Sequence, residues 1–328
     1  MKLPLRDKQV FYDELARLLR SGSPFLRAVE LLRADASGKL GRFLDRLAKA
    51  AAAGDSVLDA LAKQRPAVTE MELSIIGAAE RSGRLDRACT GLGTYFRALE
   101  QARSTVIRRS LYPLVMAHLG IFILAAPKLF LGASPALYLA QTAGVLVVVY
   151  AIVALMAWGI GGMLRFARGN VGADRLLRAI PAFGKLRASF ATARFCATLD
   201  AQLEAGVNVM ESLARAAHAS NSAWVIEHVR TAMPTLQTGA SLGDALGKTG
   251  AFPREMQRSV RLAEQTGELD AELQRLAQHY EHRALQRVEM LSEWLPKIIY
   301  GLVVLYLAYQ MVTVYSGVLA GYDKILDM

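Results

Sequence analysis

Few residues of this 328-residue sequence have the types and spacing that catalysis or metal binding needs. His279 and His282 lie three positions apart on a predicted helix with Glu281 between them, a spacing that could support a metal ion, but a third ligand of clear origin is missing. The two cysteines, Cys89 and Cys196, form no C-x-x-C pair and are predicted to be reduced core residues. We therefore predict no metal site.

Motifs of the common catalytic classes are also missing from the sequence. There is no G-x-x-x-x-G-K-[ST] phosphate-binding loop and no H-E-x-x-H motif, and no G-x-S-x-G follows a predicted strand. Glu268, Asp270 and Glu272 gather at a helix start, where negative side chains suit the helix dipole. The sequence predicts a protein that is not an enzyme and has no cofactor.

Two acidic turns remain as candidates for function. Each places acidic side chains around a glycine that breaks the chain between two long predicted helices. The residues concerned are Glu80, Gly83 and Asp86 in the first turn, and Glu264, Gly267 and Asp270 in the second. Such a turn could contact a partner protein. The same residue types also serve as turn and cap residues in any helical bundle, so both interpretations stay open.

The two turns belong to an internal duplication. Phe11, Leu15 and Gly22 are followed by GDSVLDAL from residue 54 and AERSGRLD from residue 79. Roughly 184 residues later the chain repeats this order with the landmarks Phe195, Leu199 and Gly206, then GASLGDAL from residue 239 and AEQTGELD from residue 263. Within the repeats, structural turns are expected at Gly22, Gly206, Gly54 and Gly239.

Helix signals dominate both repeats, and strand signals are missing. Ser56 and Ser241 are predicted to cap short helices, and Thr69 with Glu72 forms a capping-box pattern. We therefore expect an all-α fold with two homologous bundles of about six helices each.

Three apolar segments follow or separate these bundles. We predict transmembrane helices at 110–131, 136–164 and 297–320; the first apolar run is short and reaches the length of a span only with Leu129, Phe130 and Leu131 beyond Lys128. A short loop joins the first two segments, and basic residues flank the ends of these segments that lie away from the loop. The positive-inside rule therefore places both bundles, at 1–109 and 165–296, in the cytoplasm. The tail at 321–328 is then periplasmic, in a multi-pass bacterial inner-membrane protein.

The net charge of +10 does not indicate nucleic-acid binding, because the basic residues gather beside the apolar segments. Residues 1–109 carry 20 Lys and Arg against 13 Asp and Glu, with Arg108 and Arg109 directly before the first segment. Arg165 and Arg168 follow the second. This distribution indicates contacts with membrane lipids.

Polar residues within the apolar segments are few: His118, Gln141 and Gln310. One ionisable group is too little for an ion path, so we expect these residues to form hydrogen bonds between helices. Gly317 and Gly321 allow two helices to approach closely and favour a homo-oligomer.

Taken together, the duplicated motifs, Tyr112-Pro113 at the start of the first segment and Leu295-Pro296 at the start of the last resemble the type II secretion F-domain family. This resemblance covers about residues 8 to 320. It implies an inner-membrane platform protein of a type IV pilus or type II secretion machine. Its expected partners are a cytoplasmic assembly ATPase, pilin or pseudopilin subunits and other inner-membrane assembly proteins. The acidic turns are then candidate ATPase contacts.

Many family members carry a further segment before the first bundle, and this chain enters the bundle almost at once. That favours a short subtype similar to those of type IVb pili. The main alternative is a small polytopic transporter or channel, which would line its segments with several polar groups. A membrane receptor or adaptor would need an appended binding module, and the sequence contains none.

Overall fold

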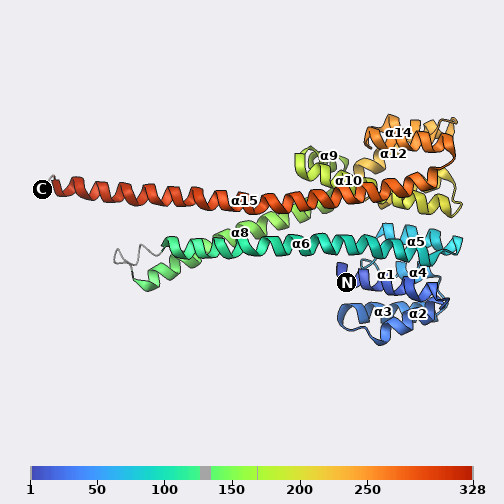
Figure 1. Cartoon of the computed structure of the whole chain (residues 1–328), viewed down its shortest axis with the longest axis horizontal. Helices are drawn as coiled ribbons and strands as arrows, with labels where there is room; N and C mark the ends of the chain where they lie inside the picture. The colour runs from blue at the N-terminus through green and yellow to red at the C-terminus, as the bar shows by residue number, and fades with distance from the viewer. Residues whose placement is uncertain (1, 126–133, 168, 327–328) are drawn as a thin grey trace. The chain divides into compact units, whose positions relative to one another are not determined.

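The computed structural model describes residues 2–125, 134–167 and 169–326, although within the long helices some side chains are not described. Every regular element in this part of the chain is a helix, which confirms the all-α prediction. Figure 1 labels the elements. The helices are α1 (Leu5–Arg20), α2 (Phe25–Ala34), α3 (Gly38–Ala52), α4 (Val57–Ala62), α5 (Glu70–Ser82), α6 (Leu85–Ala125), α8 (Pro135–Phe166), α9 (Val171–Ala179), α10 (Pro181–Glu204), α11 (Val209–Ala219), α12 (Ala223–Gln237), α13 (Leu242–Thr249), α14 (Arg254–Thr266) and α15 (Leu269–Leu326).

Repeat 1, formed by α1 to α5 and the first part of α6, packs around its own hydrophobic core. Phe11 and Leu15 lie one turn apart on α1 and are buried together with Phe43 of α3 and Ile76 of α5. The rings of Phe11 and Phe43 meet edge to face with centroids 5.2 Å apart, an arrangement that aromatic pairs prefer. The first landmark of the sequence repeat is therefore a core residue.

Repeat 2 packs α10 to α15 around a second core. Phe195 and Leu199 of α10 take the places that Phe11 and Leu15 take in repeat 1, and both are fully buried. Phe252 packs against Phe195 with ring centroids 4.5 Å apart. Helix α9 precedes α10 and contacts both α10 and α12. Cys89 and Cys196 are buried in the first and second core respectively, which confirms the prediction that both are core residues.

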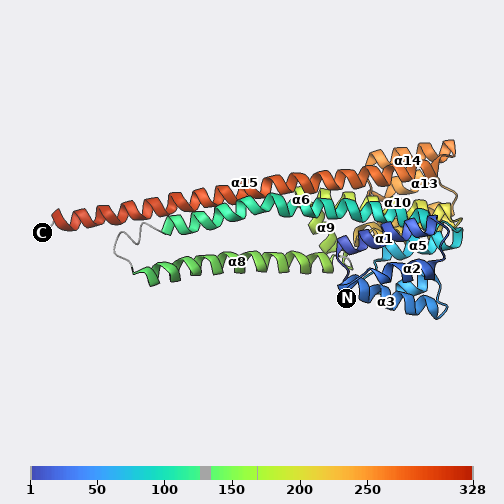
Figure 2. The same ribbon diagram turned by 60° about the horizontal axis from the view of Figure 1, so that its bottom comes forward.

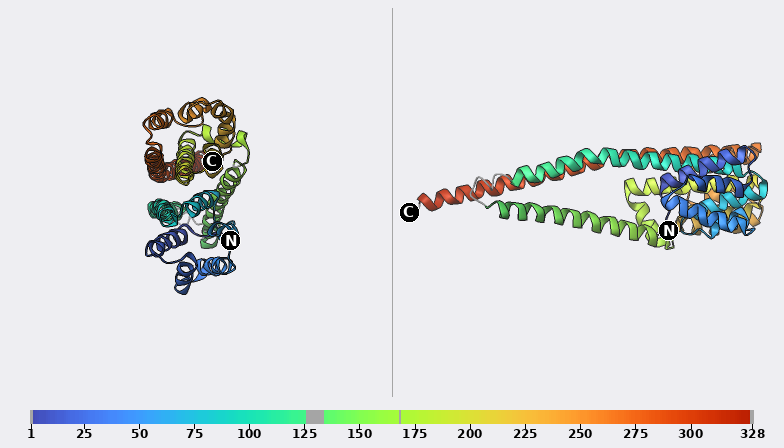
Figure 3. Two further views of the ribbon diagram at one scale, coloured as in Figure 1. Left: turned by 90° about the vertical axis from the view of Figure 1, so that its right-hand side faces the viewer. Right: turned by 90° about the horizontal axis from the view of Figure 1, so that it is seen from below.

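The two repeats share one compact unit, made of residues 1–102 and 163–287. Helix α5 of repeat 1 packs against α10 and α11 of repeat 2 (Figure 2). The end-on view shows the helices of repeat 1 in blue to cyan and those of repeat 2 in yellow to orange (Figure 3, left). Ala219 of α11 is buried in the core of repeat 1, so the boundary between the repeats is itself packed.

The second unit, residues 103–162 and 288–328, contains parts of α6, α8 and α15. Arg109 of α6 pairs with Glu289 and Glu293 of α15, at 2.9 and 2.6 Å. Arg109 lies directly before the first apolar segment in the sequence, and its positive charge is balanced by these two glutamates of the same chain. Among the described residues, no helix combines the length and the apolar character that crossing a membrane requires. Residues 126–131 of the first apolar segment lie outside the described residues.

Repeat 1 contains a buried ion pair between α1 and α5. Lys8 of α1 donates to the Glu72 carboxylate over 2.5 Å, and the Tyr12 hydroxyl donates to the same carboxylate over 2.8 Å. Burial, with the adjacent Glu72 carboxylate, raises the pKa of Tyr12 well above its usual value. Glu72 also completes the capping box with Thr69 that the sequence predicts.

The equivalent positions of repeat 2 carry no ion pair. Thr192, Cys196 and Met256 stand where repeat 1 has Lys8, Tyr12 and Glu72, and all three are buried. The same arrangement of helices therefore accommodates either a buried ion pair or three uncharged side chains at these positions. This agrees with the general finding that a buried ion pair can be replaced by uncharged residues, whereas the loss of one partner is costly.

We predict that Glu72→Met alone lowers the free energy of unfolding by about 3–5 kcal/mol, because it leaves the Lys8 ammonium buried without a counterion. Adding Lys8→Thr, which copies repeat 2, is expected to recover more than half of that loss. Urea unfolding of the purified chain, followed by circular dichroism, measures both. A double variant no more stable than Glu72→Met would show that the pair is not the source of the loss.

Candidate functional site

The acidic turn of repeat 1 contains a glutamate whose carboxylate is used inside the protein. Glu80, near the end of α5, accepts hydrogen bonds from the backbone N–H groups of Val57 and Leu58, at 2.6 and 2.9 Å. These are the first two residues of α4. Ser56 accepts from the N–H of Asp59 at 3.0 Å, so the first three free N–H groups of α4 all have acceptors.

Repeat 2 forms the same arrangement with different residues around it. Glu264 of α14 accepts from the N–H groups of Leu242 and Gly243 at 2.9 and 3.2 Å, and Ser241 accepts from Asp244 at 3.0 Å. We call each of these two arrangements a glutamate cap. Gly243 also lies tight against α14, because a Cβ placed there would lie 2.6 Å from the Arg261 backbone.

The two glutamate caps explain why the repeat motifs occur together. The motif G-x-S begins the short helix, and the A-E-x-x-G motif supplies the carboxylate that completes its N-terminus. A carboxylate at that end also favours the helix dipole. The side chains of Glu80 and Glu264 are half-buried, and their carboxylates accept hydrogen bonds within the protein, as the structural interpretation of the turns expects.

The other residues of the turns face outward to different degrees. Gly83 and Gly267 end α5 and α14 with φ of +70° and +74°, a backbone conformation that glycine adopts without strain. Both glycines are exposed, Asp270 is exposed and Asp86 is half-buried. Arg81 and Arg84 in the first turn and Glu268 in the second are also exposed, so the aspartates share the surface of the turns with other charges. The glycines expected at other turns also have positive φ: Gly22 at +84°, Gly54 at +90°, Gly206 at +71° and Gly239 at +86°.

A polar seam joins the repeats beside the first turn, and the sequence alone did not reveal it. Gln202 of α10 donates to the Ser74 carbonyl of α5 over 2.7 Å and accepts from Arg81 over 3.1 Å. Glu204 pairs with Arg87 at 3.0 Å and also with Arg84. The positions equivalent to Gln202 and Glu204 in repeat 1 are occupied by Leu18 and Arg20. Since the two repeats differ at these positions, the duplication does not predict the seam.

An acidic group of unusual pKa lies close to the second turn. Burial, and then the neighbouring carboxylates of Glu204 and Asp270, raise the pKa of Asp200 from 3.8 to about 7. Glu204 is itself part of the seam between the repeats. The charge at this place therefore changes within the physiological pH range.

The other residues that the sequence singled out are the candidate metal ligands and the polar and glycine residues of the apolar segments. His279 Nε2 lies 3.7 Å from Glu255, and in the part of the chain that the structure describes no three His, Cys, Asp or Glu side chains are grouped to hold a metal ion. The His118 ring lies 2.7 Å from the Tyr150 hydroxyl of α8, a polar contact between two helices. Gln141, Gln310, Gly317 and Gly321 lie outside the residues whose side chains are described.

The described residues form two helical bundles, and each bundle contains the same glutamate cap. The chain belongs to the type II secretion system (T2SS) protein F family, whose model matches residues 11–131 and 195–317. Each matched segment begins in the first landmark helix of one repeat and continues into the following apolar segment. The family assignment therefore follows the duplication.

Relatives of known name cover most of the chain. The type 4 fimbrial assembly protein PilC of Pseudomonas putida is 26% identical over 311 residues, which cover 88% of this chain and 77% of that protein. The type II secretion system protein F of Pseudomonas aeruginosa is 28% identical and covers 85% and 74%. The type IV pilus assembly protein PilC of Thermus thermophilus is 26% identical and covers 88% and 76%.

The raised pKa of Asp200 predicts a pH-dependent stability. The folded state holds this proton more tightly than the unfolded state, so the stabilisation is complete below pH 3.8 and is lost as the pH rises through about 7. Asp200→Asn cannot ionise. We expect it to become more stable than the parent chain as the pH rises across that window, by up to about 4 kcal/mol.

Melting temperatures at pH 5 and pH 8 measure this effect. Asp270→Asn is the matched control, because it removes one neighbouring charge and should reduce the pH dependence only in part. Equal pH dependence in the parent chain and Asp200→Asn would contradict the assignment.

Proposed function

We propose that this chain is an inner-membrane platform that couples a cytoplasmic assembly ATPase to the polymerisation of pilin or pseudopilin subunits. The observation that carries the proposal is the family's domain in two copies, packed through α5, α10 and α11 into one compact unit. Force applied to either repeat is then shared by both. The names of the relatives, in type IV pilus assembly and type II secretion, support this function.

The proposal takes the apolar segments 110–131, 136–164 and 297–320 as membrane spans, on the basis of the full sequence. Both repeats are then cytoplasmic, where an ATPase can reach them, and the spans contact the subunits of the growing fibre. Other inner-membrane assembly proteins and further copies of this chain are the expected neighbours. The contact between His118 and Tyr150 favours helix packing over an ion path through these segments.

For the ATPase contact, we propose the acidic turns, with Asp86 and Asp270 as the charged residues that a partner meets. Glu80 and Glu264 support the turns from within. A charge at the rim of an interface mainly affects the association rate and its salt dependence, whereas a buried cap affects folding. The two roles can therefore be separated by mutation.

The membrane arrangement is tested by fusions. A reporter that is active only in the periplasm should be active after Met328, and one that is active only in the cytoplasm should be active when inserted near Gly239. Basic residues beside the first two apolar segments give this orientation. The opposite pattern at both positions would contradict the proposal.

The ATPase contact is tested by reversing charge without touching the glutamate caps. We expect Asp86→Lys with Asp270→Lys to weaken binding of the cognate ATPase at least tenfold at low salt, with a smaller effect at high salt. The melting temperature should fall by no more than a few degrees, because Asp270 is exposed, Asp86 is only half-buried and changes at exposed positions cost about 0.5 kcal/mol.

The matched control is Asp35→Lys, an exposed aspartate that follows α2 in repeat 1, away from both turns. It changes the net charge in the same direction and should leave binding intact. Unchanged binding in the double variant would exclude the turns as the contact, while leaving the membrane arrangement untouched.

A further inference from the structure

Helix α9 buries a carboxylate while one of its leucines is exposed, although Leu177 of the same helix is buried and Arg175 is exposed. Its only carboxylate, Asp174, is completely buried, whereas its neighbour Leu176 is 62% exposed. Ile180, directly after the helix, is 46% exposed. A surface helix in water normally turns its apolar side inward and its charges outward. The outward side of α9 therefore combines apolar side chains with the positive charge of Arg175.

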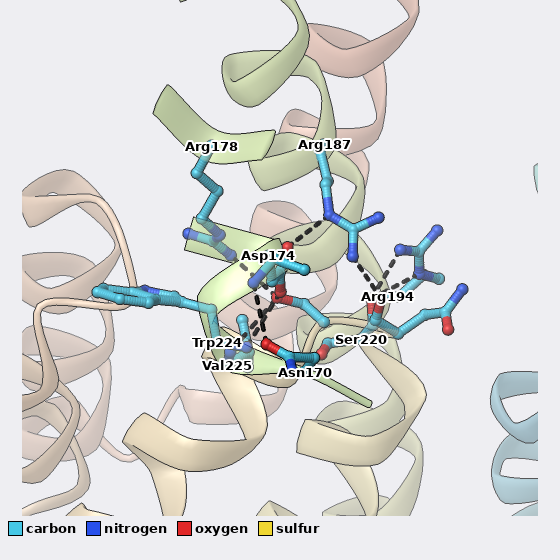
Figure 4. A network of polar contacts seen from close by, with 11 residues as sticks. Asn170, Asp174, Arg178, Arg187, Arg194, Ser220, Trp224 and Val225 are labelled. Carbon is cyan, nitrogen blue, oxygen red and sulfur yellow. Dashed lines mark hydrogen bonds and ion pairs between the residues drawn. The ribbon is translucent and has the colours of Figure 1, made fainter. Parts of the chain in front are cut away.

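A network of polar contacts fixes α9 in this orientation (Figure 4). The Asp174 carboxylate accepts from Arg187 of α10 at 2.6 Å, from the Ser222 hydroxyl at 2.5 Å and from the Trp224 N–H at 3.0 Å. The last two donors lie at the start of α12. Burial alone would raise the pKa of Asp174, but the hydrogen bonds from Arg187, Ser222 and Trp224 hold it below its usual value.

The same network stabilises the connection between α11 and α12, against which α9 packs. Arg194 donates twice to the Ser220 carbonyl, at 3.1 and 2.6 Å, and Arg178 lies over the Trp224 ring at 5.8 Å. Rotating α9 to bury Leu176 would pull Asp174 away from three donors and leave the largely buried Arg187 guanidinium without its carboxylate. Such a loss is costly, so the exposed apolar face is a stable feature of the fold.

The surroundings of this face carry positive charge. Arg165, Arg175 and Lys185 are exposed, and Asp174 is the only acidic residue between positions 163 and 187. Phe166, the last residue of α8, is 64% exposed. Large apolar side chains flanked by arginine and lysine match the boundary of a membrane, where acyl chains lie beneath anionic headgroups.

We propose that the outer face of α9 lies on the surface of an anionic bilayer. Leu176 and Ile180 enter the boundary between headgroups and acyl chains, and Arg175 binds lipid phosphate. This inference rests on the proposed function, because a membrane span at 136–164 would deliver α9 directly to that surface. It assigns to α9 the task of holding the cytoplasmic unit against the membrane.

The test uses the full chain, with Cys89→Ala and Cys196→Ala, in nanodiscs that contain phosphatidylcholine and phosphatidylglycerol. An environment-sensitive fluorophore is attached at Leu176→Cys and, in a separate protein, at Leu262→Cys. Leu262 of α14 is the matched control because it is also 62% exposed. Lipids that carry a quencher near the headgroup report contact with the bilayer.

We expect the label at position 176 to emit at shorter wavelength and to be quenched at least threefold more than the label at position 262. Arg175→Glu, and nanodiscs of phosphatidylcholine alone, should each reduce the quenching at position 176. Equal quenching at both positions would overturn the inference. So would disulfide formation between two copies through position 176 without quenching, since a second chain would then cover this face.

Carbonate extraction of membranes separates this inference from the proposed function. A chain that resists extraction but shows no quenching at position 176 overturns the role of α9 and leaves the platform proposal standing. A chain that carbonate releases overturns both.

Discussion

A helix that begins against a neighbouring helix must find acceptors for its first N–H groups, and the rest of this structure depends on how that requirement is met. In both repeats one glutamate accepts hydrogen bonds from the first two of these groups: Glu80 of α5 serves α4, and Glu264 of α14 serves α13. Hydrogen bonds to a charged group contribute about 1.5–3 kcal/mol. Each cap fixes the short helix against the helix that ends at the acidic turn, and so it places the turn.

The sequence alone predicted the all-α fold and the serine caps, because each depends on local chemistry or on helical spacing. Thr69 with Glu72 is one example, since both halves of that capping box lie within one turn. The glutamate caps were not predicted, because Glu80 lies 23 and 22 residues from the two residues whose N–H groups donate to it. The conserved spacing of the two motifs within this chain was the available signal.

The contact between the repeats could not be predicted from the duplication, because it is asymmetric. Helix α5 packs on α10 and α11, and Gln202 and Glu204, which make the polar contacts, have Leu18 and Arg20 as their equivalents in repeat 1. The same holds for α9, whose buried Asp174 looks in the sequence like an ordinary surface residue. Its three donors come from α10 and from the start of α12, distant positions that only the fold brings together.

The central claim, that the repeat motif is first a structural cap, is tested most directly by hydrogen exchange on Glu80→Ala and Glu264→Ala. Peptides that cover α4 should exchange faster only in Glu80→Ala, and those that cover α13 only in Glu264→Ala, with a lower melting temperature in each. Gln265→Ala, at an exposed neighbour of Glu264, should change neither. Unchanged exchange and an unchanged melt, together with lost ATPase binding, would contradict the claim and make the two glutamates surface contacts.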